Sequence, residues 1–319
     1  MSARQTRHRW PAAAAQSRAS AASAASAASA ASAPSAAAGP SAAAPARAAS
    51  AASAASAPSA AAVAAVDLRN VGFSYPHAER PALEGVTALI PTGGVTAILG
   101  PNGSGKSTLL HLLLGLLQAQ QGSVLVEGRP QGSYSRRELS QRVGLVPQNE
   151  TLVFELSVLE YTLLGRAPYL DLLALPHEED RAVAWEALES VGIAGLAYRP
   201  VTSLSGGEKQ LATVARALAQ APAVLLLDEP TSHLDLANAR RVLQVMAGLR
   251  AQGRTILWTT HDPNAASAIA SDILLMRQGR VIAQGPLAEV LTGERLTETY
   301  GVPVRVIDNG GRPLVLVHE

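Results

Sequence analysis

A glycine-rich loop between an apolar run and a helix-like stretch constrains this chain more than any other feature. Residues 100–108 fit the pattern Gly-x-x-x-x-Gly-Lys-Ser/Thr, and residues 95–99 before them are typical of a strand. Glycines allow the tight turn that points backbone N–H groups inward, and the following helix adds the positive end of its dipole. The order of strand, loop and helix predicts an α/β fold with a phosphate-binding site.

The residue types in this loop indicate what each would contact. Lys106 is expected to reach the β- and γ-phosphates as a point charge, and the Ser107 hydroxyl to coordinate Mg²⁺. A glycine-rich turn without function is the competing interpretation, and the flanking strand and helix argue against it. The loop residues predicted to bind the nucleotide are Gly100, Pro101, Asn102, Gly103, Ser104, Gly105, Lys106, Ser107 and Thr108.

A pair of acidic residues, Asp228 and Glu229, follows an apolar run at residues 223–227. The run lacks polar alternation, which indicates a strand buried on both faces of a parallel sheet, with the carboxylates at its carboxyl end. Alone, such a pair is more often a helix cap or a solvated turn. Beside a phosphate loop, we expect Asp228 to hold Mg²⁺ and Glu229 to orient or deprotonate the attacking water.

A second glycine-containing helix start lies at residues 205–207, before a helical stretch at residues 208–220. Its N–H groups form an anion site of the same physical kind as the phosphate loop. A serine-capped helix that has no role for a second chain is the plain alternative.

Together these motifs resemble the ATP-binding subunit of an ABC transporter, and the resemblance covers residues 66–300. It implies a P-loop NTPase cassette with a mainly parallel core sheet, an antiparallel β subdomain and a helical subdomain at about residues 149–203. The implied activity is ATP hydrolysis coupled to transport, with ATP and Mg²⁺ as cofactors. The implied partners are a second ATPase subunit in a homodimer, integral membrane permease subunits and, indirectly, a substrate-binding protein. Such a subunit would lie at the cytoplasmic face of the inner membrane, held peripherally by the permease.

Further residue roles follow from the resemblance alone. It implies that Tyr75 stacks on adenine, that Gln148 senses Mg²⁺ and the γ-phosphate, and that His261 contacts the γ-phosphate. By themselves, Tyr75 could be an ordinary strand aromatic and His261 a helix cap or core residue. The resemblance makes Gln148 and His261 catalytic together with Glu229. The residues that it implies for the ATP site of the second subunit are Ser205, Gly206, Gly207 and Asp235.

Three local patterns are similar to those of importers of ferric siderophores, haem and cobalamin. They are residues 165–169, Glu208 in place of glutamine after the glycine pair, and residues 232–235. Related subunits serve molybdate or other metals. A soluble ABC ATPase that acts without a permease, such as one for iron–sulfur assembly, is the alternative of a different class.

The first 65 residues differ in composition from the rest. They are rich in Ala, Ser and Pro, with five arginines and no acid before Asp67. Prolines interrupt the alanine runs and the small side chains bury little surface, so a disordered tail is predicted. An organelle transit peptide is a disfavoured alternative. Without these arginines, acidic residues outnumber basic ones, which argues against nucleic acid as the main partner.

Several elements are expected outside the motifs. Strand candidates lie at residues 67–75 and 86–98, and the spacing of Val242, Met246 and Leu249 favours a helix. Residues 301–319 are predicted to form a C-terminal extension with a hairpin around Gly310. The chain contains no cysteine, which excludes disulfides and thiol chemistry, and no apolar stretch is long enough to span a membrane.

Overall fold

The computed structural model describes residues 64–150, 155–171 and 173–317. The predicted tail lies outside the described residues except at its end, where strand β1 (Ala64–Phe73) already begins. Ala64 pairs with Pro91 of strand β2 (Leu83–Pro91), and the side chain of Ala65 is buried. The folded part therefore begins before the boundary that was predicted after residue 65.

A six-stranded sheet with the order β10-β9-β3-β8-β7-β6 carries the site. Its strands run parallel except for β10, which pairs antiparallel with β9. This confirms the mainly parallel core, and it brings the carboxyl ends of β3, β6, β7 and β8 to one edge of the sheet. The strands are β3 (Val95–Leu99), β6 (Val143–Val146), β7 (Val224–Asp228), β8 (Thr255–Thr260), β9 (Asp272–Arg277) and β10 (Arg280–Pro286).

A separate antiparallel sheet has the order β2-β1-β4-β5, with β4 (Gln121–Val126) and β5 (Arg129–Pro130). The single strand predicted at residues 86–98 is wrong, because it is two strands that belong to different sheets. β2 ends at Pro91, and the chain turns through Gly93, whose φ of 76° favours glycine, before β3 begins. An apolar pattern alone cannot show this change of sheet.

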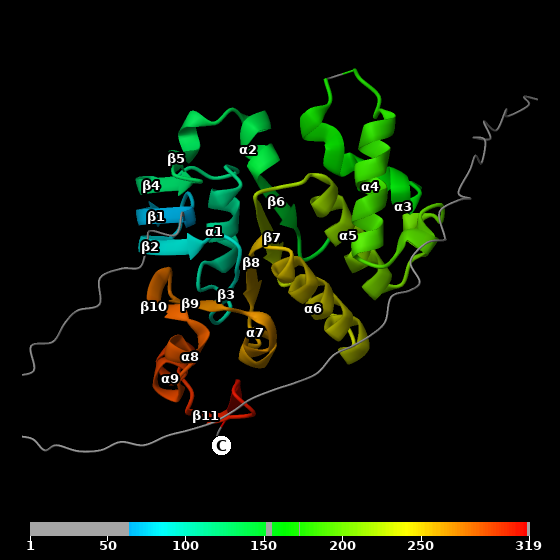
Figure 1. Ribbon diagram of the computed structural model, residues 1–319. Coiled ribbons are helices and arrows are strands. Elements are labelled where there is room, and N and C mark those ends of the chain that lie inside the picture. Colours follow the sequence, from blue (N-terminus) through cyan, green and yellow to red (C-terminus); the bar gives the residue numbers. More distant parts are fainter. Residues whose placement is uncertain (1–63, 151–154, 172, 318–319) are drawn as a thin grey trace, which may run out of the picture. The chain divides into compact units, whose positions relative to one another are not determined.

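The described residues between β6 and β7 form helices, as predicted for the helical region, apart from one isolated β-bridge. These helices lie on the opposite side of the central sheet from the antiparallel strands (Figure 1). Their bounds are α3 (Val158–Leu163), η2 (Leu164–Tyr169), α4 (Glu178–Ser190), η3 (Ala194–Leu196), η4 (Val201–Ser203) and α5 (Gly206–Ala219).

Alternate side chains of the central strands enter two hydrophobic clusters. In β7, Leu225 and Leu227 pack in the cluster that contains residues of α3, α5 and α6 (Leu236–Ala251). Val224 and Leu226 pack in the other cluster, with α1 (Lys106–Leu113) and the antiparallel sheet. This two-residue period is that of a strand with both faces covered, as the unbroken apolar run predicts.

The remaining elements flank this framework. The predicted C-terminal hairpin is present as an antiparallel pair, and one of its strands packs against α7. None of the described helices is long and apolar enough to cross a membrane. The elements are η1 (Gln131–Ser133), α2 (Arg136–Arg142), α7 (Pro263–Ile269), α8 (Leu287–Val290), α9 (Gly293–Tyr300), β11 (Val304–Asp308) and β12 (Pro313–Val317).

Candidate nucleotide site

The predicted phosphate loop connects β3 to α1, as the sequence indicates. Two of its glycines are required by close approach of other backbone. A Cβ on Gly100 would collide with the carbonyl of Met276, and one on Gly105 would lie 2.6 Å from the Ala82 carbonyl. Gly105 also has a φ of 100°, outside the range that side chains tolerate. The loop can therefore keep this path only with glycine at both positions.

Lys106 folds back over the loop that precedes it. Its ammonium donates hydrogen bonds to the carbonyls of Gly100, at 2.8 Å, and Pro101, at 3.1 Å. Burial lowers the pKa of Lys106, and the nearby carboxylates of Glu229 and Asp228 oppose that shift. These carboxylates favour the charged form, which a phosphate ligand would require.

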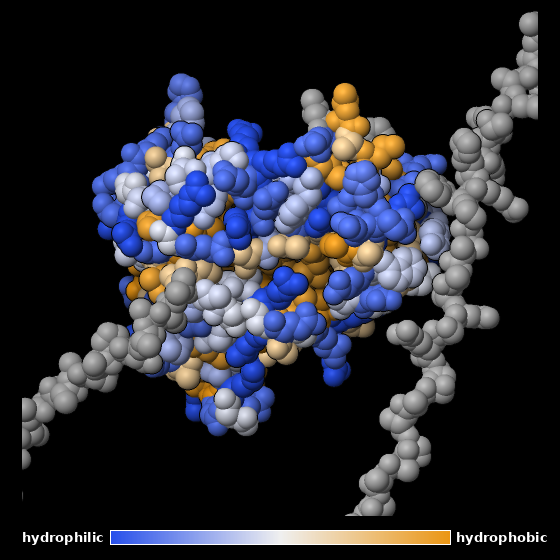
Figure 2. Space-filling model, turned by 45° about the horizontal axis from the view of Figure 1, so that its top comes forward, coloured by the Kyte–Doolittle hydropathy of each residue, from blue (hydrophilic) through white to orange (hydrophobic). Residues whose placement is uncertain are grey.

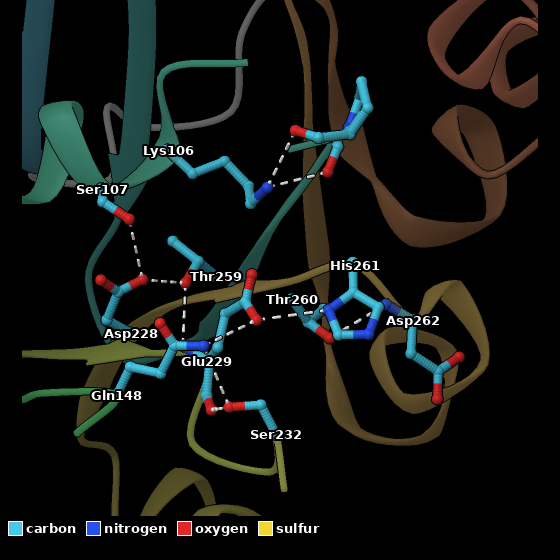
Figure 3. A network of polar contacts seen from close by, with 12 residues as sticks. Lys106, Ser107, Gln148, Asp228, Glu229, Ser232, Thr259, Thr260, His261 and Asp262 are labelled. Carbon is cyan, nitrogen blue, oxygen red and sulfur yellow. Dashed lines mark hydrogen bonds and ion pairs between the residues drawn. The ribbon is translucent and has the colours of Figure 1, made fainter. Parts of the chain in front are cut away.

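Asp228 joins the phosphate loop to the neighbouring strand β8. Its Oδ1 accepts a hydrogen bond from the Ser107 hydroxyl at 3.3 Å and another from the Thr259 hydroxyl at 2.6 Å (Figure 3). Thr259 is the partner of Asp228 in the ladder of β7 and β8. The structure thus brings Ser107 and Asp228, two of the three predicted metal ligands, into contact. Oxygen groups of this kind suit Mg²⁺.

Glu229 collects the other predicted catalytic side chains. Its Oε2 accepts a hydrogen bond from Gln148 Nε2 at 3.3 Å and lies 3.3 Å from His261 Nδ1 (Figure 3). Gln148 therefore lies against Glu229 in this structure, whereas its predicted contacts are with Mg²⁺ and the γ-phosphate. The backbone N–H of Glu229 bonds to Thr259 Oγ1, and its φ of 44° turns the chain sharply at the strand end. Three strand ends thus supply one cluster around a carboxylate.

A cavity of about 1260 Å³ opens beside this cluster. Its walls include most of the phosphate loop as well as Gln148, Glu229 and His261. Polar groups that converge on one cavity are the usual form of a ligand site, and this volume is ample for a nucleotide.

Tyr75 lies just beyond the end of β1, beside the phosphate loop. Its hydroxyl is 3.3 Å from Thr108 Oγ1, and its ring meets that of Phe73 edge-on at 5.0 Å between centroids. The side chain is partly exposed. An exposed ring face at this place is compatible with stacking on a base, and that role stays a prediction.

The four residues predicted to serve a second subunit lie at two helix starts. Ser205 caps α5 in a capping box with Glu208, and Asp235 caps α6. A Cβ on Gly207 would collide with the side chain of Asn238, so the two helix starts are packed tightly together. The described residues that line the cavity include none of this set, Ser205, Gly206, Gly207 and Asp235.

Some residues of the site were not anticipated. The Ser232 hydroxyl accepts from Gln148 Nε2 at 3.3 Å and donates to the Glu229 carbonyl at 2.7 Å. Thr259 could have been found, because a threonine at the end of a strand beside β7 faces the acidic pair. Tyr300 also lines the cavity, and no local pattern indicates it because it comes from the C-terminal helix α9.

The pattern at residues 165–169 serves packing within the helical region. A Cβ on Gly165 would collide with the Arg216 carbonyl of α5. Arg166 donates to the carbonyl of Ala219 at 2.9 Å and forms an ion pair with Asp180 at 2.9 Å. This pattern therefore fastens η2 to α4 and α5, away from the cavity.

The fold and the site define a P-loop ATPase with an inserted helical region. The chain belongs to the family of ABC transporter ATP-binding proteins, whose sequence profile, described as "ABC transporter", matches residues 83–232. It is 37% identical over 252 residues to the ferric enterobactin transport ATP-binding protein FepC of Escherichia coli. The aligned region covers 78% of this chain and 93% of FepC.

Two further comparisons agree. The chain is 39% identical over 255 residues to the hemin import ATP-binding protein HmuV of Rhodococcus jostii, covering 79% of this chain and 86% of that protein. The solved structure of a metal-chelate type ABC transporter in an inward-facing conformation matches with a TM-score of 0.70 and 35% identity, over 81% of this chain and 98% of that chain. The predicted family, fold class and ATPase activity are thereby confirmed.

Proposed function

We propose that this chain is the ATP-hydrolysing subunit of a bacterial importer for an iron–siderophore, haem or cobalamin-type ligand. The similarity to FepC and HmuV supports the class of cargo. The observation that carries the catalytic part is the contact of the Glu229 carboxylate with both Gln148 and His261, each at 3.3 Å, beside the cavity.

In this proposal Lys106 binds the β- and γ-phosphates, and the N–H groups of the loop surround them. Glu229 orients or deprotonates the attacking water, which requires a carboxylate close to the γ-phosphate. His261 and Gln148 hold that carboxylate from two sides and are the groups that contact the γ-phosphate end of the nucleotide. Tyr75 stacks on the adenine ring.

Mg²⁺ would be held by the Ser107 hydroxyl and the Asp228 carboxylate, with Gln148 as a further ligand. The contact between Ser107 and Asp228 at 3.3 Å supports this assignment, since both groups are oxygen donors at one point beside the phosphate loop. When bound, the cation would neutralise charge on the transferred phosphoryl group.

The ATP site is proposed to be completed by a second copy of the chain. Ser205, Gly206, Gly207 and Asp235 lie at helix starts that do not line the cavity of their own subunit, as far as the described residues show. The free N–H groups at a helix start can donate hydrogen bonds to an anion. In this proposal they donate to the phosphates of the nucleotide that is bound by the partner subunit.

Contact with a permease would place the chain at the cytoplasmic face of the inner membrane. The loop before α4 exposes Leu173 and Leu175 almost fully, and Figure 2 shows apolar residues gathered at this end of the helical region. Exposed apolar groups of this kind suit an interface with another protein. Gln148 directly precedes the helical region in the chain. In this proposal, a change from ATP to ADP alters the contacts of Gln148 and thereby the position of the exposed surface.

The test is ATP hydrolysis in proteoliposomes that contain the cognate permease and binding protein. We expect hydrolysis to rise when the binding protein is loaded with a ferric siderophore, haem or cobalamin. Stimulation by molybdate or another metal instead would redirect the cargo assignment. Full activity without the permease, together with no association with it, would favour a soluble ATPase and contradict the transport proposal.

A further inference from the structure

Tyr300, the last residue of α9, reaches the ATP cavity from the C-terminal part of the chain. Its hydroxyl lies 3.4 Å from the carbonyl oxygen of His261 and donates a hydrogen bond to it. The side chain of that same histidine meets Glu229. Tyr300 therefore contacts the backbone of His261, whose position determines where the imidazole lies.

Tyr300 lines the same cavity as most of the phosphate loop. Burial raises the pKa of Tyr300 to about 12, the backbone of Gly100 opposes the rise, and Asp262 adds to it. The hydroxyl therefore keeps its proton at neutral pH and can donate it to the His261 carbonyl. Tyr300 thus shares one cavity with the loop that carries Lys106 and contacts the segment that carries His261.

The C-terminal hairpin holds the other end of the His261 segment. Asn264, in the first turn of α7, donates from Nδ2 to the Val315 carbonyl at 3.0 Å and accepts from the Val315 N–H at 2.8 Å. The Ser267 hydroxyl, further along α7, donates to the Pro313 carbonyl at 2.5 Å. Residues 260–264 are therefore fixed on one side by Tyr300 and on the other by β12.

We propose that Tyr300 is a positioning residue for ATP hydrolysis, fixing the backbone of His261 so that the imidazole meets Glu229. Through this contact the C-terminal segment at residues 293–317 governs the hydrolysis rate. The inference rests on the proposed role of His261. Tyr300 lies in the C-terminal part of the chain, outside residues 83–232, which the family profile matches.

The test compares Tyr300→Phe with Tyr134→Phe in the full-length chain. Both changes remove only a hydroxyl. The hydroxyl of Tyr134 donates to the Val126 carbonyl at 3.0 Å, and neither residue is among the described residues that line the cavity. We expect Tyr300→Phe to lower kcat about three- to tenfold, the range for losing one hydrogen bond that matters in the transition state. The ATP dissociation constant should stay within about twofold, and Tyr134→Phe should keep kcat unchanged.

A second comparison separates positioning from a general loss of structure. In a His261→Ala background, single-turnover hydrolysis should change less than about twofold when Tyr300→Phe is added, because the hydroxyl then has no imidazole to aim. An equal loss in both backgrounds, or a normal kcat for Tyr300→Phe, overturns the inference. Normal turnover by Glu229→Gln would instead overturn the proposed site, so the two failures can be told apart.

Discussion

At the residue scale, the two acidic side chains at the end of β7 have different contacts, and the proposed mechanism depends on this difference. Asp228 meets Ser107 and Thr259, whereas Glu229 meets Gln148 and His261. The two carboxylates therefore have different neighbours although they are adjacent in sequence. Removal of one should affect a single function of the site.

Replacing Glu229 with Gln should abolish turnover and preserve ATP binding. The amide keeps the size of the side chain but loses the charge that we propose orients water, and losses of about 10²–10⁴-fold in kcat are typical for such groups. Steady-state hydrolysis and calorimetric ATP binding measure the two effects separately. Glu84→Gln removes the same charge from an exposed pair with Arg280 and serves as the control. Hydrolysis close to normal in Glu229→Gln would contradict this role and would assign the general base to another residue.

At the element scale, the sequence was most informative where a strand is buried on both faces. The apolar runs before residues 100, 228 and 261 predict β3, β7 and β8, because such strands need no polar alternation. The run at residues 86–98 misleads, since nothing in its hydropathy marks the turn at Gly93 between two sheets. Contacts such as Tyr300 with His261 come from segments far apart, and local patterns carry no information on them.

The helical region offers a prediction about stability and pH. Asp180 of α4 forms a mostly buried ion pair with Arg166, and the hydrogen bond from Arg166 holds the pKa of Asp180 below its usual value of 3.8. A carboxyl group with a depressed pKa stabilises the fold above about pH 3.8 and loses this effect as pH falls through its lower folded value. Asp180→Asn should therefore lower the free energy of unfolding by about 1–3 kcal/mol at pH 7.

Urea denaturation at pH 7 and below pH 3.8 measures this difference. The gap between the wild type and Asp180→Asn should shrink at the lower pH, where the wild-type carboxyl begins to protonate. Asp171→Asn provides the control, because Asp171 pairs with Arg137 while 88% exposed, and exposed pairs contribute little. A gap that is the same at both pH values would contradict the assigned cause.

At the scale of the whole molecule, the proposed shared ATP site requires each chain to contribute a different half to each of two sites. A mixture of Ser205→Arg and Lys106→Ala chains should therefore form one intact ATP site per heterodimer, although either variant alone forms none. ATP-dependent dimerisation of the mixture, measured by light scattering, is the expected result. Failure of the mixture, or normal dimerisation by Ser205→Arg alone, would argue against a shared site.

The control for this experiment lies in the chain itself. Ser157 caps α3 with the same arrangement as Ser205, since each forms a capping box with a glutamate three residues later. Ser157→Arg should cost about the same cap energy, typically about 1 kcal/mol. It should nevertheless dimerise with ATP, because Ser157 is not among the residues proposed to contact the nucleotide of the partner subunit.

The alternating burial of β7 makes the site sensitive to the insertion or deletion of a single residue in this strand. Val224 and Leu226 face α1, and Leu225 and Leu227 face the helical side. If one apolar residue were inserted into this strand, it would still be a short apolar strand. Every later side chain of the strand would nevertheless point to the opposite face of the sheet. The Asp228 carboxylate would then turn away from the Ser107 hydroxyl that it contacts here. A change that a hydropathy profile would overlook would thus separate Asp228 from the phosphate loop, where we propose that Asp228 and Ser107 hold Mg²⁺.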